Sequence, residues 1–450
     1  RFTTTFANPT HVLDYSRFGS DTLLDFYRSE YEVIRRHSPA VPITTNFMTM
    51  SQFRFLDYHD WAPHQDVVST GHDVVNSLEH PQAELSFHGD LTRGLAGRRP
   101  WMLMEHSTSA VNWQHVNPAK VPGGTILESL ARVARGADTL GFFQWRQSRS
   151  GTEKFHAALV PHAGEDSDRF REVCELGAIA ARLGEILGSR VDADVAVLWD
   201  YEALWAMSGP CMPSSALDYA TAAHTIHRLL RDRGVTCDVV HPSAVPTLYL
   251  VSDEDAASIA AAAAAGAHVV VTYFSGISDA NDHVRLGGYP GAFRELLGVR
   301  VEEFFPLKEQ ESVALSGGGT GSQWSEDARA TDAQVVTTYA NGPLAGRPAV
   351  TRRDVDAGVA WYLGTLPDDA SLGSLLDTVL HESGVEPVVR TSPGVEVVRR
   401  RSDSGSWVFV LNHTDDDCQV TASGHDLVSS TDVGPTLHLS PRTAAAVREG

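Results

Sequence analysis

The chain has 450 residues, of which 42% are hydrophobic, and its formal net charge is −21. A chain of this length predicts two or three domains, and so negative a charge argues against nucleic acid or an anionic membrane as the main partner. A soluble enzyme for a small neutral or cationic molecule fits better, and no apolar stretch reaches membrane-spanning length.

Four cysteines are widely separated along the chain, at Cys174, Cys211, Cys237 and Cys418. Their spacing matches neither a zinc knuckle nor a disulfide framework. We expect them to be buried free thiols in a reducing cytosol. The sequence therefore predicts a cytoplasmic protein without a metal or other cofactor.

Residues 1–190 alternate between strand-like and helix-like stretches. Short apolar runs typical of buried strands are Val41–Met48, Asp66–Thr70, Pro100–His106 and Leu140–Arg146. Stretches with helical periodicity are Ser20–His37, Gly124–Ala137 and Asp166–Gly188, with Ser20 as the expected N-cap of the first. This alternation predicts a parallel sheet covered by helices.

Polar and aromatic residues follow these strands directly, at the end where a (β/α)₈ barrel builds its active site. A barrel of this kind needs eight strands, and residues 1–190 offer four. We therefore expect half of a TIM barrel here, with the front of the barrel missing.

Residues 191–387 have the pattern of a doubly wound α/β domain. The expected strands are Val195–Tyr201, Cys237–His241, Pro246–Val251 and His268–Phe274. A helix over Leu217–Arg233 follows the first strand, and Ser252 with Asp255 resembles a capping box before an alanine-rich helix.

The connection from Val240 to Thr247 is unusually short for this architecture. Parallel neighbouring strands need a crossover of about a dozen residues. Either these two strands are not adjacent and parallel, or a piece of sequence is missing.

Residues 388–450 have the sequence pattern of an all-β domain. Val395–Arg401 and Trp407–His413 flank the turn-forming run Ser402–Ser406, which predicts a hairpin. We expect a small β-sandwich with no chemistry of its own.

The stretch RPWMLMEHSTSAVNWQ at 99–114 is the most informative for function. Glu105 comes just after an apolar strand, so its side chain is expected at the mouth of the barrel. Neighbouring hydroxyl and amide groups would keep it ionised, as the nucleophile of a glycosidase requires. A helix-capping or ion-paired glutamate is the alternative interpretation.

A second polar cluster follows the next strand, in FFQWR and GTEKFH. Trp113 and Trp145 have rings that can stack on the apolar face of a sugar, although a tryptophan taken singly is more often a core residue. Glu153 and His156 are three residues apart and suit sugar hydroxyls. The same pair suits a metal, but a third ligand is not apparent.

Two other pairs are given no functional role. His224 and His227 lie one helical turn apart and are expected on the surface. Asp200 and Glu202 are expected in a solvated loop. A phosphate-binding loop, a dinucleotide fingerprint and a nucleophile elbow are all absent from the sequence, and no cysteine of the second segment suits an amidotransferase.

PWMLMEHSTSAVNWQ, FFQWR with GTEKFH, the opening FANPTHVLDYSRF and DHVRLGGYPGAF together resemble glycoside hydrolase family 42, over essentially the whole chain. The resemblance implies strands five to eight of the barrel, a glutamine-amidotransferase-like (flavodoxin-like) domain that mediates trimerisation, and a small β domain. It implies a retaining β-galactosidase acting on small galactosides or oligosaccharides, assembled as a homotrimer.

Carried over by motif, the resemblance implies that Glu105 is the nucleophile and that Trp113, Glu153 and His156 contact galactose. Two departures stand out. The family's acid/base glutamate lies in an Asn-Glu motif on the fourth barrel strand. That strand would come before Phe2, and the given sequence does not contain the motif there. The family's Asp-His-Tyr motif, whose Tyr faces the substrate, corresponds here to Thr70-Gly71-His72-Asp73, so the resemblance does not carry that contact over.

These departures leave two hypotheses open. The chain is either the C-terminal part of a β-galactosidase, inactive alone because the acid/base residue is absent, or a non-catalytic remnant that keeps the trimerisation domain for assembly.

Overall fold

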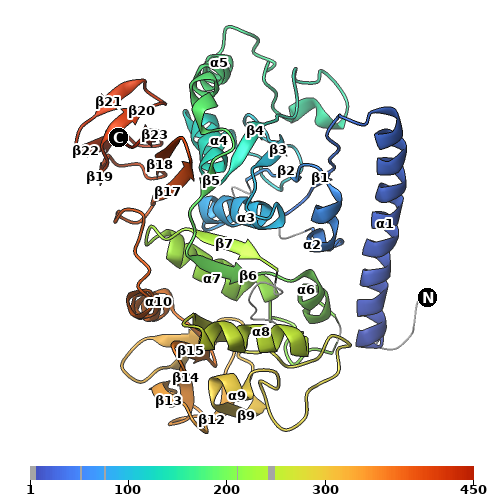
Figure 1. Cartoon of the computed structure of the whole chain (residues 1–450), viewed down its shortest axis with the longest axis vertical. Helices are drawn as coiled ribbons and strands as arrows, with labels where there is room; N and C mark the ends of the chain where they lie inside the picture. The colour runs from blue at the N-terminus through green and yellow to red at the C-terminus, as the bar shows by residue number, and fades with distance from the viewer. Residues whose placement is uncertain (1–6, 51–52, 75–77, 210, 242–248) are drawn as a thin grey trace.

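The computed structural model describes residues 7–50, 53–74, 78–209, 211–241 and 249–450. It consists of a barrel unit, an α/β unit and a β unit. In Figure 1 the barrel unit lies above the α/β unit, the β unit packs beside the barrel unit, and the long helix α1 (Pro9–His37) runs along one side. Among the described residues, no helix is both long and apolar enough to cross a membrane.

The barrel unit contains a parallel sheet in the order β1 (Asn46–Phe47), β2 (Ser69–Gly71), β3 (Trp101–Glu105) and β4 (Ala137–Leu140). The helices that follow these strands are α3 (Pro81–Leu95), α4 (Gly124–Ala134) and α5 (Asp168–Arg182). Strand and helix alternate as expected for half of a (β/α)₈ barrel. Within the described residues β1 and β4 are the two edges of this sheet.

Helix α1 begins earlier than predicted. Asn8 is its N-cap, accepting a hydrogen bond from the His11 N–H, and Pro9 occupies the first turn. The prediction of Ser20 as the N-cap is wrong. Ser20 lies buried inside the helix, where its hydroxyl accepts from the Asp57 N–H.

One face of α1 carries large apolar side chains that are exposed. Tyr15, Phe18 and Phe26 on this helix are 76%, 64% and 63% exposed. Contiguous apolar side chains on a surface mark a place where another part of a protein normally packs. This face of α1 is therefore a surface on which another polypeptide segment could pack.

The fourth barrel strand ends earlier than predicted. The structure places it at Ala137–Leu140, so the expected strand Leu140–Arg146 is wrong. The FFQWR run continues as a loop, in which Trp145 is 70% exposed and Arg146 forms a bridge with Val160. Aromatic content alone therefore misplaced this strand.

The paired parallel strands of the α/β unit lie in two separate sheet pieces. In the first, β6 (Val195–Leu198) pairs in parallel with β7 (Cys237–Val240). In the second, β8 (His268–Thr272) pairs in parallel with β15 (Gly358–Leu363), followed by the antiparallel strands β14 (Pro348–Val355) and β13 (Gln334–Thr338). The main helices of this unit are α7 (Tyr219–Arg231), α8 (Asp253–Ala264) and α10 (Asp369–Ser383).

The expected strand Pro246–Val251 lies partly outside the described residues. Its described part, Tyr249–Val251, forms only a bridge between Leu250 and Ser278. The capping box before α8 is confirmed, because Ser252 accepts from the Asp255 N–H and donates to its carboxylate.

Short elements complete the barrel and α/β units. They are α2 (Tyr58–Trp61), η1 (Ala62–His64), η2 (Thr152–Phe155), η3 (Leu183–Ile186), α6 (Tyr201–Met207), α9 (Arg294–Leu297), β9 (Val299–Phe304), β10 (Val313–Ala314), β11 (Thr320–Ser322), β12 (Glu326–Ala330) and β16 (Leu366–Pro367). β9 pairs with β12, and β10, β11 and β16 form a small antiparallel sheet.

The β unit is a sandwich, as predicted. Its larger sheet runs β21 (Thr431–Val433), β20 (Gly424–Asp426), β23 (Ala444–Arg448), β18 (Gly405–Asn412), β17 (Val395–Ser402) and β5 (Arg190–Val191). The predicted hairpin is β17 with β18. One apolar face packs on the second sheet, β19 (Cys418–Thr421) with β22 (Thr436–Leu439), and the other packs on α4 and α5.

Three predictions about polar residues and thiols are wrong. His227 is buried and its Nε2 lies 2.8 Å from Asp90 Oδ2, while His224 stacks on Trp199. Asp200 is the buried N-cap of α6, accepting from the Glu202 N–H. Of the four cysteines, Cys237 and Cys418 are buried but Cys174 and Cys211 are exposed. The two histidines are placed by contacts with segments distant in sequence, which local periodicity does not report.

Candidate active site

Glu105 is the last residue of β3, and three adjacent strands determine its surroundings. It faces Gly71 of β2 in the sheet register, and the Asn46 side chain of β1 donates from Nδ2 to Glu105 Oε2 at 3.2 Å. Its carboxyl group is therefore held at the carboxyl end of the sheet, as predicted for a residue at a barrel mouth.

Gly71 makes room for this arrangement. A Cβ atom at this position would lie 2.9 Å from Asn46 Nδ2 and 3.3 Å from Glu105 Cβ. Any larger residue would push Asn46 away from the carboxylate. Asn46 Oδ1 is buried and has no hydrogen-bond partner among the described residues, so it is an acceptor available to a hydroxyl group in the site.

Asp73 is a carboxylate of the site that the sequence reasoning missed. It follows β2, and its Oδ1 accepts a hydrogen bond from the Ser107 N–H at 2.7 Å. Its Oδ2 lies 3.9 Å from His156 Nε2. The run Gly71-His72-Asp73 stood out in the sequence, but only the pairing of β2 with β3 shows that Asp73 belongs beside Glu105.

The electrostatic surroundings change the acidity of Glu105. Burial raises its pKa above the ordinary value, and the negative charge of Asp73 raises it further. The charge of His156 and the hydrogen bond from Asn46 act in the opposite direction, and Glu153 adds a small upward contribution. Asp73, Glu153 and His156 thus all lie near enough to influence this carboxyl group.

Glu153 and His156 come from the short helix η2 and the residue after it. Asn112 fixes η2 by donating to Glu153 Oε2 at 2.9 Å and to the Thr152 carbonyl at 2.8 Å. His156 is buried, and its Nδ1 lies 3.0 Å from the Ala157 carbonyl oxygen. Because a carbonyl only accepts, Nδ1 carries a hydrogen and Nε2 faces Asp73.

The structure therefore gathers Glu105, Glu153 and His156 around one site. Trp113 follows Asn112 in the chain, the residue that binds Glu153 and Thr152. Its ring is 46% exposed and available for stacking.

A buried polar network lies behind the site. Lys120 Nζ donates to the Ser107 carbonyl at 2.6 Å and lies 3.2 Å from His106 Nε2 and 3.0 Å from Glu128 Oε2. Burial lowers the pKa of His106 well below its ordinary value, so this imidazole is neutral. These contacts fix the loop that follows Glu105.

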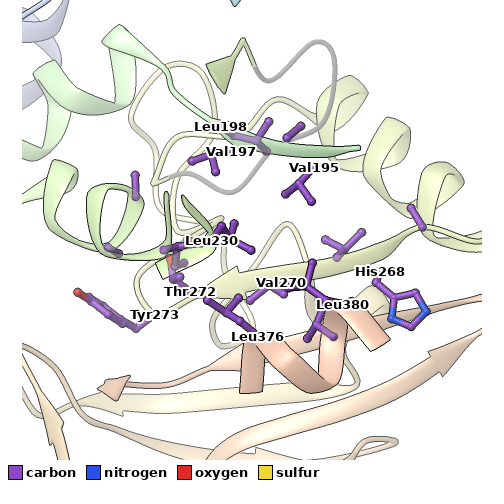
Figure 2. A pocket seen from close by; sticks show the side chains of 18 of the residues that line it. Val195, Val197, Leu198, Leu230, His268, Val270, Thr272, Tyr273, Leu376 and Leu380 are labelled. Atoms are coloured by element: carbon purple, nitrogen blue, oxygen red, sulfur yellow. The ribbon is translucent and has the colours of Figure 1, made fainter. Parts of the chain in front are cut away.

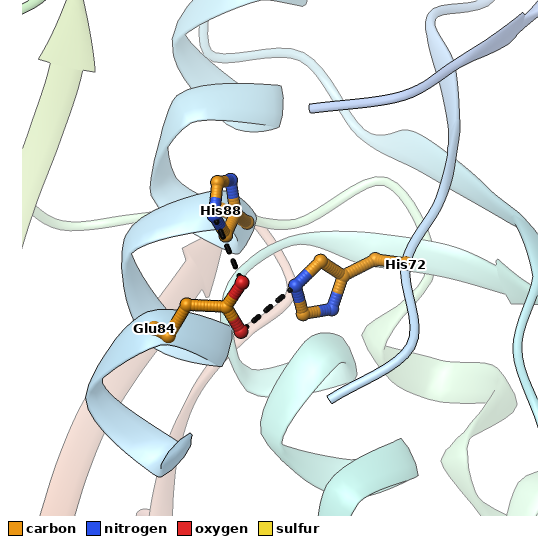
Figure 3. A group of neighbouring side chains, drawn as sticks. All are labelled: His72, Glu84 and His88. Atoms are coloured by element: carbon orange, nitrogen blue, oxygen red, sulfur yellow. Dashed lines mark ion pairs between the residues drawn. The ribbon is translucent and has the colours of Figure 1, made fainter. Parts of the chain in front are cut away.

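A second cluster next to this network has the composition of a metal site. His72, Glu84 and His88 are buried, and their ligand atoms all lie within 4.8 Å of one another (Figure 3). Each imidazole Nε2 is 3.2 Å from one oxygen of Glu84. This possible ligand set was not anticipated from the sequence.

Contacts with Arg132 determine which ring nitrogen of His72 carries the hydrogen. Arg132 Nη2 lies 2.9 Å from His72 Nδ1 and donates to the His72 carbonyl at 2.8 Å. A guanidinium only donates, so Nδ1 is the acceptor and the hydrogen of His72 is on Nε2, where a metal would need a lone pair. The set fits a metal poorly, and we interpret it as a carboxylate held between two imidazoles.

A carboxylate at the mouth of a barrel, held by an amide and flanked by a second acid and a buried imidazole, has the chemistry of a glycoside hydrolase. The family comparisons agree along the chain. Residues 1–183 match the family 42 glycoside hydrolase model described as Beta-galactosidase, 193–386 match its trimerisation domain, and 394–442 match its C-terminal domain. The chain belongs to the family 42 β-galactosidases.

Individual relatives show the same relationship. The chain is 52% identical over 432 residues to an Arthrobacter β-galactosidase, covering 94% of this chain and 62% of that protein. It is 38% identical over 424 residues to β-galactosidase BgaB of Geobacillus kaustophilus, covering 91% and 63%. The crystal structure of β-galactosidase from Bacillus circulans sp. alkalophilus superimposes with a TM-score of 0.95 at 32% identity, covering 100% and 70%. The chain thus spans less than two thirds of the length of these two curated relatives.

Proposed function

We propose that this chain is the C-terminal part of a retaining β-galactosidase that removes terminal β-D-galactose from small galactosides, with Glu105 as the nucleophile. The observation that carries the proposal is the position of Glu105 at the end of β3, with Asn46 donating to its carboxylate. In such a mechanism the carboxylate attacks the anomeric carbon and forms a galactosyl-enzyme, which water then hydrolyses.

Galactose recognition is assigned to three side chains. Glu153 and His156 would hydrogen-bond the sugar hydroxyls, and the exposed ring of Trp113 would stack on the apolar face of the sugar. The support is that Glu153 and His156 both act on the charge of Glu105 and that Asn112 joins the Trp113 loop to Glu153.

The 450-residue chain is proposed to lack turnover by itself. Retaining hydrolysis needs a proton donor about 5–5.5 Å from the nucleophile. Asp73 is a second carboxyl group beside Glu105, but its Oδ1 already accepts a hydrogen bond from the Ser107 N–H. A barrel also needs eight strands to close, and the described sheet has four.

We further propose a cytoplasmic homotrimer. The match of residues 193–386 to a trimerisation domain supports the assembly, and the absence of disulfides between the four cysteines is compatible with a reducing compartment.

A non-catalytic remnant that keeps only the assembly function is the second candidate, and the exposed apolar face of α1 is compatible with it.

The test is covalent trapping. A dinitrophenyl 2-deoxy-2-fluoro-galactoside has a leaving group that needs little acid assistance, so it can label a nucleophile even where the proton donor is missing. We expect the label on Glu105 after peptide mapping, and no label in Glu105→Gln. Labelling of another carboxylate would refute the assignment. So would retained activity of Glu105→Gln in a fusion protein, in which the preceding barrel residues of a relative are joined to Arg1 of this chain.

A further inference from the structure

The α/β unit has a vacant strand position between its two sheet pieces. Figure 2 shows Val195 and His268 at one end of the gap and Leu198 and Tyr273 at the other, so β6 and β8 run in the same direction on its two sides. β6 is bonded to β7 and β8 to β15. Within the described residues β6 and β8 are not bonded to each other.

A cavity of about 430 Å³ occupies this position. Its lining is mostly apolar and comes from both strand edges and from two helices. α7 contributes Ala223 and Ile226, and α10 contributes Leu376 and Val379. Strands in the middle of a doubly wound sheet are enclosed by helices in this way and are apolar on both faces.

The gap lies beside a short connection of the chain. In the described residues the chain leaves β7 at Val240, and its next strand or helix is α8 from Asp253. The short connection noted in the sequence thus coincides with the missing strand. Tyr249–Val251 reaches only the end of the gap, bridging to Ser278.

We propose that this cavity binds an extended apolar segment of another polypeptide as an added parallel strand. Backbone groups on the inner edges of β6 and β8 have no partner among the described residues, because the hydrogen bonds of these strands go to β7 and β15. An extended peptide offers donors and acceptors on both of its edges, whereas an aliphatic small molecule would leave the edge groups unpaired.

The flanking strands set the size of the ligand. β6 has four residues and β8 has five, and a strand advances about 3.3 Å per residue, so a segment of four or five residues fills the gap. Valine and isoleucine suit it, because both faces meet apolar helices. This binding site goes beyond the proposed hydrolase function and does not depend on Glu105.

The experiment uses the 450-residue chain and a fluorescent peptide with a Val-Ile-Val-Ile core between lysines. We expect saturable binding in fluorescence anisotropy, and protection of the β6 and β8 amides in hydrogen exchange. Ala223→Trp, which fills the cavity, should weaken binding by at least about tenfold. Ala261→Trp, at an exposed position of α8, should leave binding unchanged.

A second peptide distinguishes strand addition from adsorption and does not depend on the folding of any variant. Methylation of alternate backbone nitrogens removes the donors along one edge and keeps the apolar side chains. We expect this peptide to lose binding. Equal binding of both peptides, or no binding of the unmodified one, would overturn the proposal.

Discussion

Arg135 at the end of α4 donates from Nε to Glu396 Oε1 of β17 at 2.9 Å, and both side chains are buried. Arg135 also pairs with Asp90 of α3, which contacts His227 Nε2 of the α/β unit at 2.8 Å. Arg231 of α7 closes the network by donating to Glu396 Oε2 at 2.9 Å. One buried network thus joins the barrel, α/β and β units.

Glu396→Gln should destabilise the chain by roughly 3–5 kcal/mol, because it leaves buried guanidinium groups without their counter-charge. Urea denaturation followed by circular dichroism measures this loss. Glu386→Gln is the matched control, since Glu386 is largely exposed and pairs with exposed Arg390 at 3.5 Å. Equal effects of the two substitutions would show that the network does not hold the units together.

Asp73→Asn should shift the pH dependence of catalysis in a protein completed with the preceding barrel residues of the Arthrobacter relative. The nucleophile must be ionised, and the Asp73 charge raises the pKa of Glu105. Removing that charge lowers this pKa, so the acidic limb of kcat/KM should move to lower pH. An acidic limb that stays in place would exclude electrostatic coupling of the two carboxyl groups.

Glu326 should make stability depend on pH. Burial raises the pKa of this carboxyl group to about 7 from 4.5, although it accepts hydrogen bonds from Tyr362 and Trp324. The neutral carboxyl group of Glu326 therefore contributes its full stabilisation of the fold below the pKa that this group has in the unfolded chain. That contribution is lost as pH rises towards 7. Relative to Glu326→Gln, the wild-type chain should lose on the order of 3 kcal/mol between pH 4.5 and pH 8, a difference of about 2.5 pKa units. Parallel curves of unfolding free energy against pH would disagree with a buried neutral acid.

Metal removal should leave the chain unchanged. Arg132 holds the hydrogen of His72 on Nε2, so His72, Glu84 and His88 are expected to act without an ion. Dialysis against a chelator, followed by metal analysis and a thermal melt, should show no bound zinc and the same Tm. A stoichiometric metal whose removal lowers the Tm, with the same drop in His88→Ala, would reverse this interpretation.

Much of the architecture could be predicted from local patterns. The apolar run before Glu105 predicted β3, and the two strands around Ser402–Ser406 predicted the β17–β18 hairpin. In both places the strand is bounded by residues that report it locally, a charged residue after an apolar run and a polar turn.

The remainder depended on contacts between distant segments. Asn46 and Asp73 belong to the candidate site because β1, β2 and β3 are neighbours, which no spacing in the sequence reveals. His227 was expected in water, but Asp90 provides a buried partner 137 positions away. The short connection after Val240 could be seen in the sequence, but the cavity between β6 and β8 could be found only in the structure.

The most direct measurement is hydrolysis of 4-nitrophenyl β-galactoside by the purified 450-residue chain, beside the same chain completed with the front of the barrel. We expect the completed protein to turn over and to lose activity with Glu105→Gln, with azide restoring some activity to Glu105→Ala. The chain alone should be slower by at least the 10²–10⁴ that general acid assistance typically contributes. Robust turnover by the chain alone that disappears with Glu105→Gln would mean that a carboxyl group among these 450 residues supplies the proton, contrary to this account.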